Sequence, residues 1–140
     1  MIDIAEAEQR VLAALEEAQE DSITAVLNMI IEPTGDNEEI ILYDSVAKSL
    51  IDRGFIRLAI ARGVDGKLLD ETVDQSLLLF SNFLHNFLFD AERRIWTLAY
   101  DRGFGADRKP FPNFVLTKSG LEASISVLKK RGWMWWQKPV

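Results

Sequence analysis

Residues 36–60 read DNEEIILYDSVAKSLIDRGFIRLAI, and the prediction of the fold starts from this stretch. Asp36 followed by Glu39 is a capping-box pattern, in which two side chains satisfy free backbone amides at the start of a helix. The spacing of the apolar residues predicts a helix that ends just before Gly54, because glycine fits the left-handed position past a helix end. Residues 55–60 are rich in β-forming side chains and predict a strand.

Two more helices are predicted before this stretch. Apolar residues recur at helical spacing over residues 4–19, after a capping pattern that begins at Asp3. Asp21 and Ser22 can cap a second, shorter helix, which the Pro-Thr-Gly turn at 33–35 separates from the third. The first part of the chain is therefore expected to form three helices followed by a strand.

A long apolar helix is predicted over residues 70–90, where apolar side chains recur at helical spacing. Within Leu77–Phe89 the apolar stripe is so wide that little polar face remains. A helix of this kind is buried, either in the core of the domain or in a dimer interface. The sequence leaves both possibilities open.

The C-terminal part predicts two strands and a last helix. Residues 94–100 and 113–116 are expected to pair as a hairpin around the turn-rich loop at 101–110. Thr117 can cap the helix, and Gly132 can end it after three basic residues, which the helix dipole favours in a last turn.

We therefore expect a mainly α-helical fold with a small antiparallel β-hairpin. A chain of 140 residues is one domain by the usual size of domains, and it can bury a core without disulfides. We assign residues 1–132 to this domain, with 61–92 as an insertion that contains the candidate dimerisation helix. Residues 133–140 form a Trp-rich C-terminal tail.

Three short phrases resemble the winged helix-turn-helix domains of the MarR- and PadR-like families. Ser49–Ile56, SLIDRGFI, resembles the end of the third helix in those domains, where L-x-x-x-G-φ-I leads into the first wing strand. Phe114–Leu121, FVLTKSGL, resembles the Y-x-L-T-x-x-G phrase that ends the wing and starts the next helix. Leu42-Tyr43 resembles PadR-like third helices. The chain departs from the family in its insertion at 61–92.

The resemblance implies a winged-helix fold and a DNA-binding transcriptional regulator. In winged-helix families that bind DNA, the third helix enters the major groove and the wing contacts the minor groove or the backbone. The expected partner is double-stranded DNA. The candidate contact residues are Tyr43, Ser45, Lys48 and Ser49 in the third helix, and Arg102, Arg108 and Lys109 in the wing loop.

The distribution of charge opposes this hypothesis. Residues 1–50 hold twelve acidic and two basic side chains, or 2 − 12 = −10, whereas the remainder holds 14 basic and 10 acidic, or +4. Carboxylates such as Glu38 and Glu39 at the start of the third helix would repel phosphates. The alternative is a winged-helix-like protein–protein interaction module that does not bind DNA, in which the third helix is a capped core helix.

A homodimer is expected, because aromatic and large apolar residues populate interface cores. The chain concentrates such residues in Leu77–Phe89 and in the tail. The alternative is that both segments pack into the domain itself. The candidate interface residues are Leu77, Phe80, Phe83, Leu84, Phe87, Trp133, Trp135 and Trp136.

Several classes of function are excluded or disfavoured by composition. Cys is absent and His85 is the one His, which excludes thiol catalysis, thiolate metal sites and sites that need two imidazoles. His85 is expected to be buried, and Asp70, Glu71 and Asp74 to form the acidic first turn of a helix rather than a cation site. We find no catalytic constellation and expect neither an enzyme nor a metal or other cofactor.

Targeting signals are not apparent either. The N-terminus lacks the basic and apolar regions of a secretory signal, and Leu77–Phe89 is shorter than the roughly 20 apolar residues that span a bilayer. We therefore expect no membrane association and a soluble cytoplasmic protein.

Overall fold

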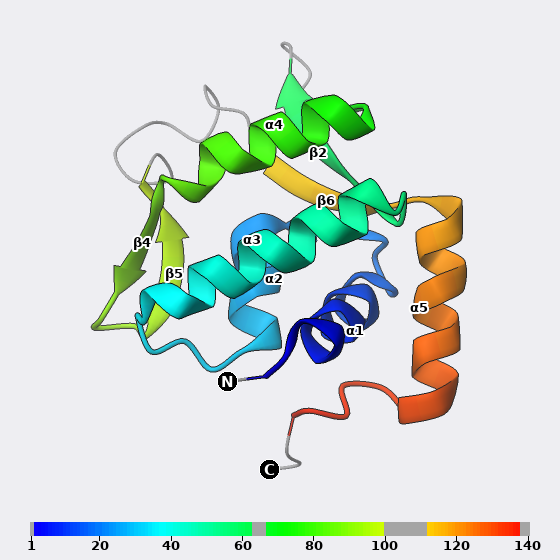
Figure 1. Ribbon diagram of the computed structural model, residues 1–140, viewed down its shortest axis with the longest axis horizontal. Helices are drawn as coiled ribbons and strands as arrows, with labels where there is room; N and C mark the ends of the chain where they lie inside the picture. The colour runs from blue at the N-terminus through cyan, green and yellow to red at the C-terminus, as the bar shows by residue number, and fades with distance from the viewer. Residues whose placement is uncertain (1, 63–66, 100–111, 138–140) are drawn as a thin grey trace.

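Five helices surround a small antiparallel sheet in the computed structural model, which describes residues 2–62, 67–99 and 112–137 (Figure 1). The expected class, mainly α-helical with a small antiparallel β component, is therefore confirmed. No helix in the described part of the chain is long and apolar enough to cross a membrane.

The helices begin close to the predicted positions, and most end there too, although the first helix ends about one turn before the predicted residue 19. They are α1 (Ile4–Leu15), α2 (Ile23–Ile30), α3 (Asn37–Asp52), α4 (Val73–Leu84) and α5 (Lys118–Arg131). Helix α4 is also much shorter than predicted. Figure 1 shows α3 between α1 and α4, with strands of the sheet behind it.

The caps are local features, and the predicted N-cap residues form them. Glu6 and Glu39, which were expected to complete capping boxes with Asp3 and Asp36, bind other partners instead. The side chains of Asp3, Ser22, Asp36 and Thr117 each accept a hydrogen bond from a backbone amide in the first turn of the helix that follows. Gly54 adopts a φ of +80° directly after α3, a conformation that residues with a Cβ rarely adopt.

The main sheet joins segments from both ends of the chain. Its strands are β1 (Glu20–Ser22), β2 (Ile56–Arg62), β3 (Lys67–Asp70) and β6 (Pro112–Leu116), in the order β1-β6-β2-β3 with antiparallel neighbours. β6 is central, and its register places Phe114 opposite Leu58 of β2. The short strands β1 and β3 were not predicted from the sequence.

The predicted pairing of residues 94–100 with 113–116 is wrong. β5 (Ile95–Leu98) instead pairs with β4 (Phe87–Asp90), and these two strands form a separate sheet. A four-residue turn joins β4 to β5, so β5 pairs with the strand that precedes it directly in the sequence. β6 alternates buried and half-buried residues, which suits a central strand over the core.

The predicted helix over 70–90 is correct only as far as Leu84. His85 is the C-cap of α4, and it is exposed rather than buried as expected. Phe87 continues the helical spacing of the apolar residues, but it also fits a strand in which every second side chain faces the core. A short apolar run of this kind satisfies both periods, so periodicity could not locate the end of the helix.

Aromatic rings form the centre of the core. Tyr43, Phe80 and Phe114 are fully buried, with ring centroids 5.6–6.0 Å apart, and Phe87 lies at 6.1 Å from Tyr43. The three pairs that include Tyr43 meet edge to face, an arrangement that the charge distribution of aromatic rings favours. These contacts join α3, α4, β4 and β6 into one cluster.

α5 begins in close contact with the end of α3. Thr117 donates its side-chain hydroxyl to the Gly54 carbonyl at 2.6 Å and its backbone amide to the Phe55 carbonyl at 3.0 Å. A Cβ atom on Gly120 would lie 1.8 Å from the Phe55 carbonyl oxygen, so only glycine fits there.

We predict that Gly120→Ala destabilises the protein by about 2–4 kcal/mol, because the added methyl group forces α5 away from the Phe55 carbonyl. The free energy of unfolding from a denaturant titration measures this effect. Ser126→Ala, at an exposed position of the same helix, is the control and should change little. A stabilised Gly120→Ala variant, as expected for alanine in an unconstrained helix, would contradict the close packing.

Candidate functional site

Tyr43 is one of the predicted DNA-contacting residues, but the structure buries it, so it cannot contact DNA. Its side chain is 1% exposed, and its hydroxyl donates a hydrogen bond to the Ile23 carbonyl at 2.5 Å. Burial, to which the charge of Asp21 adds, raises the pKa of Tyr43 well above its usual 10.0. Tyr43 therefore holds α2 against α3 as a neutral core residue.

The other three candidates on α3 lie nearer the surface, but their polar groups have partners within the chain. Ser45 is exposed and donates to the Ile41 carbonyl at 3.3 Å. The Lys48 ammonium lies 2.8 Å from the Asp44 carboxylate. Ser49 donates to the Glu8 carboxylate at 3.3 Å, and that carboxylate also pairs with Arg53.

The outward side of α3 is acidic. We call it the outer row of α3, and it consists of Asn37, Glu38, Ile41, Asp44, Ser45, Lys48 and Asp52. Three carboxylates against one ammonium give the row a formal charge of 1 − 3 = −2. Ile41 is the large apolar residue in the row, and it is 51% exposed. Such a row repels phosphates and offers few free donors to bases.

The wing candidates Arg102, Arg108 and Lys109 lie outside the described residues, between β5 and β6.

The candidate interface residues of α4 and β4 mostly face the core. Phe80 and Phe87 are buried, and Leu77, Phe83 and Leu84 are half-buried against the same core. In the neighbourhood of these residues, Leu78 is 64% exposed and Leu88 is also exposed. The fold thus covers most of the apolar stretch Leu77–Phe89 without a second molecule.

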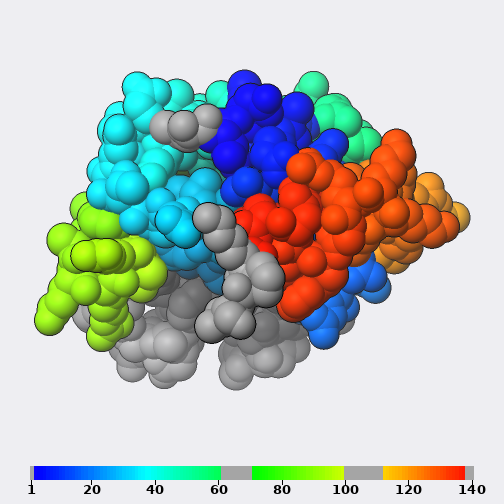
Figure 2. All heavy atoms as spheres, turned by 90° about the horizontal axis from the view of Figure 1, so that it is seen from below, coloured from blue at the N-terminus to red at the C-terminus, as the bar shows by residue number. Residues whose placement is uncertain are grey.

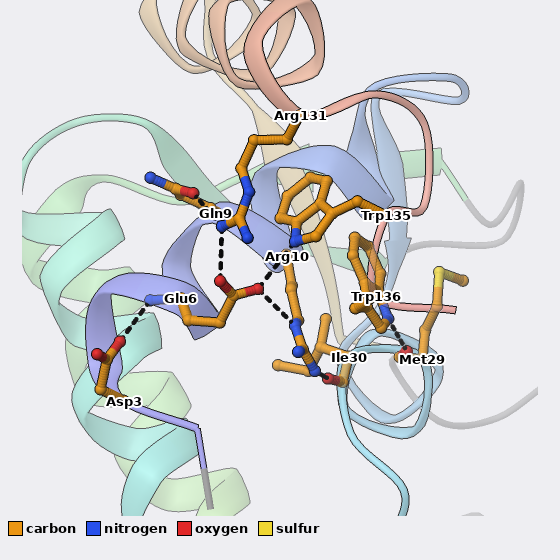
Figure 3. Close-up of polar contacts among 9 residues, drawn as sticks. All are labelled: Asp3, Glu6, Gln9, Arg10, Met29, Ile30, Arg131, Trp135 and Trp136. Atoms are coloured by element: carbon orange, nitrogen blue, oxygen red, sulfur yellow. Dashed lines mark hydrogen bonds and ion pairs between the residues drawn. The ribbon is translucent and has the colours of Figure 1, made fainter. Parts of the chain in front are cut away.

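The Trp-rich segment also packs onto the domain. We call residues 133–137 the C-terminal segment, and Figure 2 shows it (red) against the N-terminal part of the chain (dark blue). Trp135 donates its indole N–H to the Glu6 carboxylate, and Trp136 donates to the Met29 carbonyl, each at 3.0 Å (Figure 3). Trp133 is 68% exposed, so one of the three indoles stays on the surface.

Glu6 is the centre of this polar cluster. Its carboxylate accepts hydrogen bonds from Arg10 at 2.8 Å, Arg131 at 2.6 Å and Trp135 at 3.0 Å (Figure 3). Arg10 and Arg131 also lie over the rings of Trp136 and Trp135, respectively. The cluster joins α1, α2, α5 and the C-terminal segment. No sequence pattern identifies this cluster, because its hydrogen-bonded partners lie up to 129 residues apart in the chain.

A second buried carboxylate holds the start of α3. Glu39 is 6% exposed and accepts hydrogen bonds from the amides of Thr34 and Gly35 and from the indole of Trp96 at 3.0 Å. The side-chain amide of Asn28 donates to the Trp96 carbonyl and accepts from the Trp96 backbone amide, each at 2.8 Å. These are the two bonds that the backbone of a neighbouring strand would make. The β4–β5 hairpin is thereby fixed to α2 and to the loop before α3.

Of the three acidic residues predicted to form the first turn of a helix, one does so. Asp74 lies in the first turn of α4, as predicted, whereas Asp70 belongs to β3. No group of three or more His, Asp or Glu side chains in the described part of the chain is arranged to hold a metal ion.

Comparison with protein-family models, with curated proteins and with solved structures finds no match to this chain.

We predict that Glu6 makes stability depend on pH in the acid range. Burial raises the pKa of Glu6, but the hydrogen bonds from Arg10, Arg131 and Trp135 together lower it below the ordinary 4.5. A lowered carboxyl pKa contributes stability that is present above pH 4.5 and is lost as the pH falls through the folded value. Thermal melts of the wild type and Glu6→Gln between neutral and acid pH measure this contribution.

The Glu6→Gln variant should lose about 1–2 kcal/mol at neutral pH and show a smaller loss on acidification. Glu17→Gln, at an exposed position after α1, is the matched control and should behave as the wild type. If Glu6→Gln and the wild type lose stability in parallel as the pH falls, the carboxylate of Glu6 does not hold the segment in the way described.

Proposed function

We propose that this chain is a winged-helix-type interaction module that works through protein contacts rather than by reading DNA with α3. The winged-helix part of the proposal is supported by strand pairing. The family resemblance makes β2 the first wing strand and β6 the strand that leads into the next helix, and these two strands pair antiparallel. Strand β3, helix α4 and the β4–β5 hairpin then lie between the two wing strands in the chain.

One observation carries the choice of protein contacts over DNA, namely the acidic outer row of α3. A recognition helix needs free donors for base edges and cations for phosphates. In the outer row the ammonium of Lys48 pairs with Asp44, while Glu38 and Asp52 are exposed. The exposed Ile41 among these carboxylates suits a protein surface better than a phosphate backbone.

A DNA-binding transcriptional regulator is the second candidate. It is supported by the basic residues Arg102, Arg108 and Lys109 of the wing and by Arg93 and Arg94, which are exposed at the β4–β5 turn. In this version phosphate contacts from loops, rather than base contacts from α3, supply the affinity.

We predict that the wild type does not shift mixed-sequence duplex DNA in a gel at about 50 mM salt, where backbone affinity is strongest. The triple variant Glu38→Gln, Asp44→Asn, Asp52→Asn should gain measurable affinity if its carboxylates oppose binding. Glu16→Gln, Glu17→Gln, Glu20→Gln removes the same charge elsewhere and is the control. A wild-type shift that is lost in Ser45→Ala, Lys48→Ala would overturn the proposal and favour the regulator.

We also propose a homodimer, whose contact surface is made by the predicted interface residues and their neighbours that stay exposed. Leu78, Leu88 and Trp133 are the exposed large apolar residues in the described part of the two predicted interface segments, whereas Phe80 and Phe87 are buried within one chain. Sedimentation at micromolar concentration should give a dimer that Leu78→Ser or Trp133→Ser weakens tenfold or more, since a buried large side chain contributes about 1.5–3 kcal/mol. A single monomeric species for the wild type would contradict the dimer.

A further inference from the structure

Two cavities border the Glu6 cluster and share a wall. The first, of about 510 Å³, lies between α1, the end of α2 and the C-terminal segment. The second, of about 360 Å³, extends from there to the start of α3. Arg10, Ile31 and Glu32 line both cavities, so the two adjoin at these residues, and we call the pair the groove. Volumes in this range are those of sites that hold small organic molecules.

The groove has apolar walls at both ends. Met29 and the indole of Trp136 line the first cavity, Ile2 lines the second, and Ile31 lies between them. Trp136 is fixed in place, because its N–H donates to the Met29 carbonyl and its ring packs edge to face on Trp135 at 4.8 Å (Figure 3). A fixed indole presents a rigid apolar surface to a ligand.

The described residues that line the groove carry a net negative charge. Its walls hold Glu32, Asp36 and Glu39 against Arg10, or 1 − 3 = −2. The guanidinium of Arg10 is already engaged, since it donates to the Glu6 carboxylate and to the Ile30 carbonyl at 2.8 Å each. It is therefore poorly placed to attract an anion into the groove.

The three carboxylates differ in what they can still bind. Glu39 is saturated by donors from the loop and from Trp96, and Asp36 accepts from the Glu38 amide as the N-cap of α3. Glu32 is exposed, and it has no ion pair among the described residues. Glu32 is thus the free carboxylate of the groove, and it stands in the wall common to both cavities.

We propose that this groove binds a small organic cation, a primary amine with an aromatic or aliphatic body. The ammonium group lies against Glu32, with Asp36 adding to the negative field, and the apolar body packs on Ile31 and Trp136. A carboxylate of the same shape is rejected, because the net charge of the walls is negative and Arg10 is already paired. Such a ligand would join the end of α2 to the loop before α3, independently of whether α3 contacts protein or DNA.

The test compares two probes of matched shape, 2-phenylethylamine and 3-phenylpropionate, by titration at millimolar concentration with amide NMR of the full chain. The amine should shift the amides of residues 28–36 and the indole of Trp136. Its affinity should exceed that of the carboxylate at least tenfold, as expected for opposite signs of interaction with a partly exposed charge.

Glu32→Gln should weaken amine binding about fivefold to tenfold while leaving the spectrum otherwise folded, and Glu17→Gln should leave binding unchanged. Trp136→Leu keeps an apolar side chain and should weaken binding less than Glu32→Gln. Equal binding of the two probes, undiminished binding to Glu32→Gln, shifts confined to residues outside the groove, or no binding of the amine each overturns the proposal.

Discussion

The contact between the start of α5 and the turn after α3 is the constraint on which the rest of the structure depends. Thr117 caps α5 and at the same time binds the carbonyls of Gly54 and Phe55, and Gly120 allows the helix to approach within van der Waals contact. This contact fixes β6 beside β2, because each strand adjoins one side of it. The sheet, and the face of α3 that remains outside, follow from this arrangement.

Burial of α3 explains why its polar residues offer little to DNA. The helix lies between α1 and α4, so its inner positions enter the core and its flanks meet carboxylates of neighbouring elements. Tyr43 is placed inside by this packing, and Arg53 and Ser49 are drawn to Glu8 on α1. What remains outside is a row in which carboxylates outnumber the ammonium group, and the proposal of protein contacts rests on this row.

Two buried or half-buried carboxylates connect parts of the chain that no local pattern links. Glu39 joins the loop before α3 to Trp96 in the inserted hairpin, and Glu6 joins α1 to Arg131 and Trp135 near the C-terminus. Both were visible in the sequence only as acidic residues near helix starts, where a capping role is the ordinary interpretation. Their real partners lie 57 and 125 residues away, respectively.

The sequence by itself determined the helix starts at Asp3, Ser22, Asp36 and Thr117 and the strands at 56–60 and 113–116, because caps and short periodic patterns depend on neighbouring residues. Only the tertiary structure decided which strands pair, where α4 ends and whether Tyr43 faces the core or the solvent. Phe87 fits a helix and a strand equally well, and β5 could pair with either of two neighbours. Such choices depend on the free energy gained when whole segments bury their apolar surfaces against one another. That gain requires contacts between parts of the chain that are distant in sequence, so no local pattern contains it.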